Sequence, residues 1–516
     1  MNYTKSRFNN YCLSLLAVVA SLGMVTGELS AQYSPLAPPP ADLKEGFDSI
    51  NIEQSKQWLG VLAGPGFEGR GTGQPGYTKA AHWVAGKLAE FGLEPIGDNG
   101  TYFQMLPMKR RLPVLEECFI SGPGDLKIVA KDNMGFERYT DQPETVGEIV
   151  FVNFSGANTR FAEDAEFRDK IVIYVADDKA SRSAATQLAR KRPAAAIRVI
   201  TGKPNSISQL IREGGRRRST SVSGTITKSA ATKMIEGLGG KASWLSQPEK
   251  EGVEIFDKFK LPGAEDPAAQ QVTLRMRYHE ELAAVPNVVG WLEGSDPALK
   301  HEYVVLGSHL DHLGIRGGQV YPGADDNGSG STAVLNIAKA FATNPQRPKR
   351  SVLFIWFAAE EIGLVGSRHY CNNPTKPLED MTCMFNIDMV GRNEESQNET
   401  AKENEGHIHL VGSTKGDIAI HEIVLKANES VGFEFEMDEE DVWNRSDQIN
   451  FFNAANVPVS FLFDGFHPDY HRPTDQVEKI NFKKLVSAAK LYYLAVNLAS
   501  DHGRFEPNPA KSTSEK

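Results

Sequence analysis

The residues with the clearest capacity for chemistry are histidines and acids that follow short apolar runs. Four such runs lie in the second half of the chain, at residues 303–306, 352–359, 383–387 and 457–463. The polar side chains that follow them are, in chain order, His309, Glu360 with Glu361, Asp388, and His467 with His471. Carboxylates gathered at one place repel each other unless a cation neutralises them. The pattern therefore predicts a metal site.

A glycine-rich turn supplies a further acid. The stretch PGADDNGSG places Asp326 just before a helix expected at residues 331–341. A turn of this kind can bring one carboxylate close to two cations. Glu360 and Glu361 are neighbours, so their side chains diverge. One of them can bind a metal while the other faces the substrate water.

This ligand set indicates a hydrolytic centre. Imidazole and carboxylate ligands without a thiolate suit zinc, with manganese or cobalt as substitutes. One carboxylate shared by two ions about 3.5–4 Å apart is the geometry of two-metal hydrolases. The spare glutamate would take the proton of the attacking water and deliver it to the leaving amine. Asp311 either binds a metal directly or accepts the other ring N–H of His309.

Parallel strands are the elements expected to position these groups. Short apolar runs that stop at a glycine or a charge are typical of strands buried on both faces of a sheet. In an open α/β sheet, ligands and catalytic groups collect at the carboxyl ends of the strands. We therefore expect an α/β fold with a mixed, mostly parallel central sheet, helices on both faces, and the metal site at one sheet edge.

Composition sets the outer limits of this interpretation. The chain has 516 residues, of which 40% are hydrophobic, and a net charge of −10. The length suffices for two or three domains, and the charge does not indicate a nucleic acid partner. Among the four cysteines, Cys371 and Cys383 are close enough in sequence to bridge, although spacing alone does not establish the geometry.

The N-terminus is typical of an exported protein. Lys5 and Arg7 precede an apolar segment at residues 13–25, and Leu29-Ser30-Ala31 ends the stretch with small residues. This is the arrangement of a cleaved signal peptide. The alternative, a membrane anchor, is disfavoured because the apolar run is short and interrupted. We expect a periplasmic or extracellular protein with no stable membrane insertion after cleavage.

Changes in composition and in the pattern of apolar residues divide the chain into segments. We expect a signal peptide at residues 1–31, a Pro-rich linker at 32–44, a first catalytic part at 45–111, an inserted β-rich α/β domain at 112–280, a second catalytic part with the metal site at 281–502, and a disordered tail at 503–516. The acidic stretch at residues 433–441 is expected to be a solvated loop.

The motifs resemble a known family. GSHLDHLG, PGADDNGSG, FAAEEIGLVGS, FNIDMVGR and DYHRPTDQVEKI are similar to the five motifs of the co-catalytic zinc aminopeptidases. Glutamate carboxypeptidase, glutaminyl cyclase and the transferrin receptor belong to the same family. LAGPGFEGRGTGQPGY and GLEPIGDNGTYFQ resemble its N-terminal segment, and the insert resembles a protease-associated domain through GEIVFVN, DKIVIYV and PAAAIRVI.

The resemblance implies roles for individual residues. One zinc ion would be held by His309, Asp326 and Asp388, and a second by Asp326, Glu361 and His471, with Asp326 as the bridge. Glu360 would be the general base, Asp311 would support His309 from behind, and Tyr470 would stabilise the oxyanion. Asp325 is not expected to bind metal, and neither of the spare histidines, His312 and His467, is expected to be a ligand.

The resemblance implies an aminopeptidase that hydrolyses N-terminal residues from peptides. A carboxypeptidase acting on acidic peptides is an alternative that would need several arginines at the substrate pocket, with Arg392 and Arg445 as candidates. A glutaminyl cyclase shares most of the motifs, and a non-catalytic receptor would need lost ligands, whereas all five ligand positions are kept. The expected partner is a peptide substrate; the oligomeric state is left open.

Overall fold

The computed structural model describes residues 33–507, except for residues 141, 157, 178–179, 205, 207–208, 213–220, 247–249, 258–270, 317, 397–398 and 438–440. The expected signal peptide and the end of the expected tail lie outside the described residues. No described helix has both the length and the apolar character needed to cross a bilayer.

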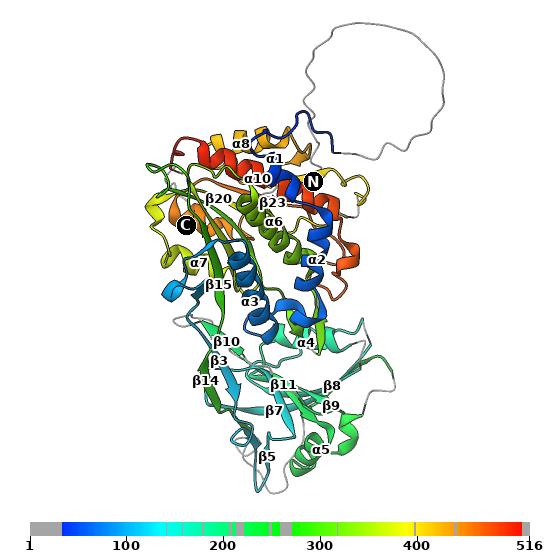
Figure 1. Ribbon diagram of the computed structural model, residues 1–516. Helices are drawn as coiled ribbons and strands as arrows, with labels where there is room; N and C mark the ends of the chain where they lie inside the picture. Colours follow the sequence, from blue (N-terminus) through cyan, green and yellow to red (C-terminus); the bar gives the residue numbers. More distant parts are fainter. Residues whose placement is uncertain are drawn as a thin grey trace, which may run out of the picture.

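A nine-stranded sheet forms the centre of the larger part of the molecule (Figure 1). Its order is β1–β15–β19–β16–β20–β23–β21–β22, and β2 also pairs with β15. The strands are β1 (Glu94–Pro95), β2 (Phe103–Met105), β15 (Pro286–Leu292), β16 (Tyr303–His309), β19 (Ser351–Phe357), β20 (Met381–Ile387), β21 (His407–Val411), β22 (Glu434–Glu436) and β23 (Val459–Phe463). The four neighbours β19, β16, β20 and β23 run parallel, with antiparallel strands toward both edges. The predicted mixed sheet with a parallel centre is confirmed.

Helices cover both faces of this sheet because both faces of its central strands are apolar. Every residue of β15, β16, β19, β20 and β23 is buried. Alternate residues point to opposite faces, so Val304 and Leu306 join one core, whereas Tyr303 and Val305 join another. The first core also contains residues of α1 (Lys44–Ser49), α2 (Ile52–Leu62), α3 (Pro75–Glu90), α6 (Gly330–Thr343), α8 (Ala419–Asn428) and α10 (Phe482–Asp501). The second contains Tyr370 of α7 (Val365–Asn372).

The cysteines lie apart in these cores. Cys371 and Cys383 are buried and free, and they belong to the cores on opposite faces of the sheet. The sheet itself therefore separates the two thiols, and the disulfide that their sequence spacing allowed is not formed.

Residues between β2 and β15 form two further sheets, which lie below the central sheet in Figure 1. One sheet has the order β5–β4–β13–β7–β8–β9–β11–β6, with β12 also pairing with β7, and the other has the order β10–β3–β14. The strands are β3 (Met108–Pro113), β4 (Phe119–Ser121), β5 (Lys127–Val129), β6 (Met134–Arg138), β7 (Glu144–Ser155), β8 (Ile171–Ala176), β9 (Ala195–Ile200), β10 (Gln209–Arg212), β11 (Val222–Thr227), β12 (Gly252–Phe256), β13 (Gln271–Arg275) and β14 (Tyr278–Leu282). Helices α4 (Ser181–Arg190) and α5 (Lys228–Gly237) accompany them.

The inserted segment has hydrophobic cores of its own and also contacts the part of the molecule around the central sheet. Its buried residues form two clusters separate from those of the central sheet. The expected boundaries at residues 112 and 280 fall inside β3 and β14, and the division into domains stays a prediction. Leu210 packs against the main core, and the Arg110 guanidinium donates to the Gly73 carbonyl.

Shorter elements complete the catalytic part. They are the hairpin β17 (Gly314–Arg316) and β18 (Gln319–Tyr321), the helix α9 (Gln448–Asn450), the 3-10 helices η1 (Pro65–Arg70), η2 (Asp98–Gly100), η6 (Leu378–Asp380) and η8 (Val477–Lys479), and the π-type turns η5 (Ala324–Ser329) and η7 (Phe451–Ala455). In the insert, η3 (Ala242–Leu245) is a further 3-10 helix. The expectation of a loop throughout residues 433–441 is wrong over β22, because Phe435 packs against the main core and pairs with Ile408 of β21.

Candidate metal centre

The ends of the parallel strands bring the predicted residues together. His309 is the last residue of β16, Asp388 directly follows β20, and Glu360 and Glu361 lie in the turn after β19. His471 lies in the loop beyond β23, and Asp326 comes from η5. Because β19, β16, β20 and β23 are parallel neighbours, their carboxyl ends meet at one sheet edge.

His309, Asp326 and Asp388 form the first group of potential metal ligands. The Nε2 atom of His309 lies 3.1 Å from Oδ1 of Asp388 and 3.4 Å from Oδ1 of Asp326. The other ring nitrogen, Nδ1, lies 3.0 Å from the main-chain carbonyl of Asp311. If Nδ1 donates to that carbonyl, the lone pair of Nε2 faces the two carboxylates, as a metal-binding histidine requires.

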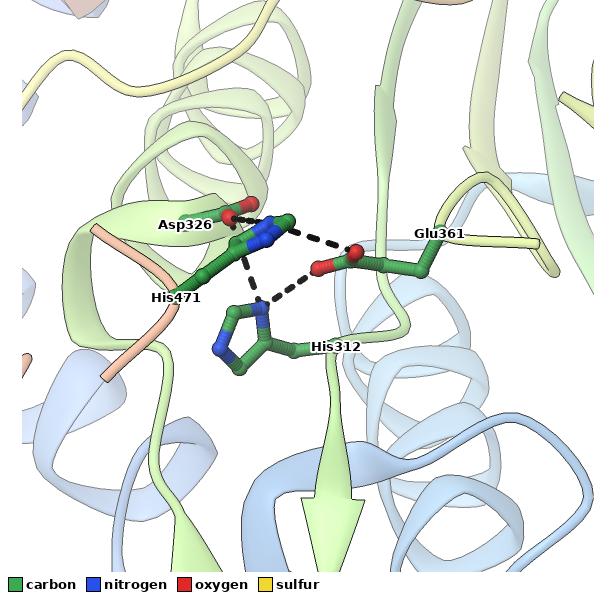
Figure 2. Close-up of side chains that lie close together, drawn as sticks. All are labelled: His312, Asp326, Glu361 and His471. Atoms are coloured by element: carbon green, nitrogen blue, oxygen red, sulfur yellow. Dashed lines mark ion pairs between the residues drawn. The ribbon is translucent and has the colours of Figure 1, made fainter. Parts of the chain in front are cut away.

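Asp326 also belongs to the second group, with Glu361, His471 and His312 (Figure 2). Nε2 of His471 lies 3.0 Å from Oδ2 of Asp326 and 3.3 Å from Oε2 of Glu361. Nδ1 of His312 lies 2.7 Å from Oε1 of Glu361 and 3.5 Å from Oδ2 of Asp326. The two oxygens of Asp326 therefore face different groups, which is the arrangement of a bridging ligand.

The residues of both groups fit divalent cations. Oδ2 of Asp326 and Oε1 of Glu361 are buried, and histidine nitrogens lie at ion-pair distance from both. Burial alone would lower the pKa of His471, but Asp326 and Glu361 raise it to about 10. The carboxylates of the two groups thus lie close to each other and to the imidazoles of His309, His312 and His471. Bound cations would neutralise these carboxylates.

Glu360 stands beside the first group rather than within it. Its Oε2 lies 4.0 Å from Nε2 of His309, and its main-chain N–H donates to Oδ1 of Asp311 at 3.0 Å. Burial raises the pKa of Glu360 well above its usual value, and Asp388 adds to that rise while His309 opposes it. Burial also favours the neutral form of Glu361, but hydrogen bonds from His312 and His471 outweigh it and lower the pKa of Glu361.

Asp311 supports the site through more than one contact. Its main-chain carbonyl faces His309, whereas its carboxylate accepts from the Glu360 N–H and, at 2.5 Å, from the Thr72 hydroxyl. Burial raises the pKa of Asp311 to about 6, and His309 opposes that rise. Asp311 lies in neither ligand group. Its contacts hold both the metal-facing histidine and the turn that carries Glu360.

Arg70 positions the loop that carries Asp326, and no motif predicted this role. Its guanidinium is fully buried and donates to four main-chain carbonyls, those of Leu62, Leu310, Pro322 and Gly323. It thereby joins η1 to the end of β16 and to the start of η5. Burial lowers the pKa of Arg70 to about 10, while Asp326, first among the nearby carboxylates, raises it. The residue lies in the glycine-rich stretch GPGFEGRGTGQPG, where a buried arginine has no local signature.

A further layer of polar residues holds Asp325 away from the two ligand groups. Oδ1 of Asp325 accepts from the Gly391 N–H, and Oδ2 lies 3.1 Å from Nε2 of His467. The main-chain N–H groups of Asp325 and Asp326 both donate to Asp475. His467 is thus a partner of Asp325, outside both ligand groups, whereas His312 lies within the second group.

Asp388 is oriented by the loop around Ser446. The Ser446 hydroxyl donates to Oδ2 of Asp388 at 2.7 Å, and Asn386 donates to Ser446. Asp447, the next residue, is buried beside the cluster, and burial raises its pKa to about 7 against the opposing effect of His309.

A pocket opens beside the first ligand group, and its far wall is apolar. Met389, Val442, Phe461, Phe463 and Phe466 form this wall. Arg445 and Tyr470 line the same pocket, with the guanidinium 4.7 Å from the centre of the Phe466 ring. The Tyr470 ring stacks on His471 at 3.9 Å between centroids, and its hydroxyl lies 3.4 Å from Arg445. Burial raises the pKa of Tyr470.

Comparison with known proteins identifies the part of the chain that builds this site. Residues 287–496 match the model of peptidase family M28. They belong to that family. The family predicted from the motifs is therefore confirmed, and the matched range contains every residue of both ligand groups. The protease-associated character of the insert stays a prediction.

Two curated relatives are aminopeptidase YwaD of Bacillus subtilis and leupeptin-inactivating enzyme 1 of Streptomyces exfoliatus. The first is 27% identical over 254 residues, which are 48% of this chain and 51% of the relative. The second is 32% identical over 194 residues, which are 37% of this chain and 38% of the relative. The chain thus spans about half or less of the length of these relatives.

A solved structure shares the fold. The aminopeptidase of Aneurinibacillus sp. strain AM-1 superposes with a TM-score of 0.50 over 91% of this chain and 99% of that one, at 19% sequence identity. This likeness supports the predicted fold class.

Proposed function

We propose that this protein is an exported dinuclear zinc aminopeptidase that releases N-terminal residues from peptides. The observation that carries the proposal is the pair of ligand groups that share Asp326, with Glu360 beside them in neither group. In this proposal His309, Asp326 and Asp388 hold one ion, and Asp326, Glu361 and His471 hold the other. His312 faces Glu361 from the side and orients its carboxylate.

The chain's own residues would divide the chemistry among them. Two bound zinc ions would supply Lewis acidity to the scissile carbonyl and make the attacking water more acidic. Glu360 accepts a proton from that water and returns it to the departing amine as the peptide C–N bond breaks. The Tyr470 hydroxyl donates a hydrogen bond to the oxygen on which negative charge develops. Asp311 keeps both His309 and Glu360 in place.

The pocket supports an apolar N-terminal side chain as the preferred substrate group. Its wall of Met389, Val442 and three phenylalanines would bury such a side chain beside the first ligand group. A carboxypeptidase would need several arginines there. Arg445 is the single arginine among the described residues that line the pocket. Arg392 instead pairs with Asp469 at 3.1 Å. The proposal therefore favours recognition of an α-ammonium.

The test combines metal analysis with a substrate panel. Purified protein is expected to hold zinc and to hydrolyse aminoacyl substrates with Leu, Phe or Met at the N-terminus faster than those with Asp or Lys. Dipeptides with a C-terminal Glu and N-terminal glutaminyl peptides complete the panel. Turnover of C-terminally acidic peptides alone would assign a carboxypeptidase, cyclisation of glutaminyl peptides would assign a cyclase, and no turnover by the zinc-loaded protein would favour a binding protein.

A further inference from the structure

A second cluster of histidine and glutamate lies at the edge of the central sheet, outside the centre described above. It consists of His409 on β21, Glu436 on β22 and Glu394 in the loop after β20. One potential ligand atom from each of the three lies within 4.8 Å of the other two. None of the motifs that predicted the main centre includes these residues.

The spacing of the cluster matches that of the main centre. Nε2 of His409 lies 3.1 Å from Oε2 of Glu394 and 3.8 Å from Oε2 of Glu436. In the main centre, His309 lies 3.1 Å and 3.4 Å from its two carboxylate neighbours. Four ligands placed tetrahedrally about 2.0–2.1 Å from a zinc ion lie roughly 3.4 Å from each other. The three atoms can therefore share one ion with little movement.

Strand register fixes the arrangement of the histidines and glutamates. In the parallel pair β21–β22, His407 is opposite Glu434 and His409 is opposite Glu436. The residues between them, Ile408 and Phe435, belong to the main core, so the polar four share the other face. The buried Ile408 and the partly buried Phe435, which packs against the main core, fix the orientation of this face.

A neighbouring histidine orients the carboxylate of Glu436. Nδ1 of His407 lies 2.7 Å from Oε1 of Glu436, which directs Oε2 toward His409. Nε2 of His407 lies 3.3 Å from Glu434. Metal ligands are commonly held in this way by a second layer of polar groups.

The charge balance of the cluster favours a cation. Glu394, Glu434 and Glu436 face two imidazoles. Burial lowers the pKa of the Lys484 ammonium, and Asp464 and Asp325 oppose this effect more strongly than Glu436 and Glu394 do. The side chains of His409, Glu394 and Glu436 are 13%, 22% and 27% exposed, so water can reach the cluster to complete the coordination of an ion.

We propose that Glu394, His409 and Glu436 form a third metal site, which takes one divalent transition ion, with zinc the best match to one imidazole and two carboxylates. His407 orients Glu436 within that site. The proposal does not depend on the activity proposed above, because it concerns different side chains on the opposite side of the pocket wall.

The third site would brace the apolar wall of the substrate pocket. The His409 ring lies 5.6 Å from the Phe463 ring, and the N–H of Glu395 donates to the Phe466 carbonyl. The Glu394 side chain packs so closely on Gly465 that a Cβ there would lie 2.5 Å from the Glu394 Cβ. An ion that joins Glu394 to β21 and β22 would hold the loop after Asp388 and the segment 463–466 together.

The experiment counts bound zinc with the main centre disabled. Each variant is equilibrated with Zn²⁺, freed of excess metal by gel filtration and analysed by mass spectrometry of the metal. Asp326→Ala is expected to retain about one equivalent, whereas Asp326→Ala combined with Glu394→Gln or with His409→Gln is expected to retain none. Glu434→Gln, placed on the exposed strand face beside the cluster, is the matched control and should keep the ion.

Two outcomes would overturn the proposal. One is an Asp326→Ala protein that holds no zinc although circular dichroism shows it folded. The other is an equal zinc content with and without Glu394→Gln, which would show that His409 and the glutamates form ion pairs only. The same series reports on the main centre separately, because the Glu394→Gln single variant should keep the two ions of the proposed peptidase site.

Discussion

At the scale of single residues, small differences in orientation give different tasks to acids that are adjacent in the sequence. Asp325 and Asp326 are neighbours, yet Asp325 accepts the Gly391 N–H and faces His467, whereas the two oxygens of Asp326 face the two ligand groups. Glu360 and Glu361 divide in the same way. Glu361 contacts His312 and His471, and Glu360 stands 4.0 Å from His309.

The shared position of Asp326 leads to a prediction about metal content. Asp326→Ala removes a ligand from both central ions and is expected to lose both, while His471→Ala removes a ligand from one ion and should lose about one. Metal analysis in the Glu394→Gln background would count the central ions alone. Full central metal content in Asp326→Ala would contradict the bridging role.

The separation of the two glutamates leads to a second prediction. Glu360→Gln keeps the size of the side chain but removes its basicity, so it should keep its metal while kcat falls by at least the ~10²–10⁴ typical of lost general acid–base catalysis. Glu361→Gln is the matched control and should instead weaken one metal site. The measurement pairs metal content with kcat for both variants. Metal loss in Glu360→Gln with full metal in Glu361→Gln would mean that the roles are exchanged.

At the scale of elements, the buried guanidinium of Arg70 fixes the position of η5 through hydrogen bonds to residues that are distant in the sequence. Arg70 donates to carbonyls of residues 240 to 253 positions away, at Leu310, Pro322 and Gly323, as well as to Leu62 nearby. The Asn327 side chain adds a second connection, because it donates to the Ile387 carbonyl and accepts from the Gly330 and Met389 N–H groups. These contacts fix the position of Asp326 relative to β16 and β20.

Arg70→Met is expected to destabilise the protein strongly. The change keeps much of the side-chain volume but leaves buried carbonyls without donors, and each unsatisfied buried group costs about 1–3 kcal/mol. We expect a loss of about 3 kcal/mol or more, seen as a lower urea midpoint, together with weaker zinc retention. Arg316→Met, on the exposed hairpin after Gly314, is the control and should leave the midpoint nearly unchanged.

The insert touches the site through the loop that contains Thr72. Leu210 of β10 lies against Gly73, where a Cβ would be 2.6 Å from the leucine, and Thr72 donates to Asp311, which in turn holds the Glu360 N–H. Among its described residues, the insert carries no member of either central ligand group. Its contacts can therefore shape access to the site without building it.

Removal of the insert should change substrate range more than metal content. The two ends are adjacent, since the Ala283 N–H donates to the Met108 carbonyl, so residues 109–282 can be replaced by two glycines. We expect the deletion protein to keep its zinc and to change the ratio of kcat/KM between short and long peptides. Leu210→Ala in the full chain tests the loop contact alone. A folded deletion protein without metal would show that the insert helps to form the centre.

The sequence predicts the catalytic sheet well because its strands are continuous apolar runs and its acids stand at their ends. Local patterns of this kind are visible without knowledge of the partners. Arg70 is not predictable in the same way, because its burial depends on carbonyls contributed by distant segments. His312 shows a similar limit: its sequence position beside His309 does not reveal that it turns toward Glu361. Strand β22 is also not visible in the sequence, because charged residues flank Phe435, its single apolar residue.

At the scale of the whole molecule, the distribution of charge and apolar surface around the centre bears on the proposal that the protein acts at the N-terminus of peptides. The carboxylates of Asp326, Glu360 and Asp388 line the pocket together with the residues of the apolar wall. A field of this sign attracts a cation, although two zinc ions would offset part of it. Arg445, the single arginine among the described residues of the pocket, packs on the Phe466 ring and lies near the Tyr470 hydroxyl.

The direction of attack along the peptide follows from this arrangement. A free α-ammonium is stabilised near the uncompensated carboxylates, whereas an α-carboxylate would need arginines beyond Arg445 to replace its hydration. Acetylation of the N-terminus of a peptide such as Leu-Ala-Ala should therefore abolish turnover, and amidation of its C-terminus should leave kcat/KM nearly unchanged. Product analysis by mass spectrometry distinguishes the released residue. Turnover of the acetylated peptide together with loss of turnover on amidation would place the protein among carboxypeptidases, and Arg445→Gln, which should be nearly neutral for an aminopeptidase, would then abolish activity.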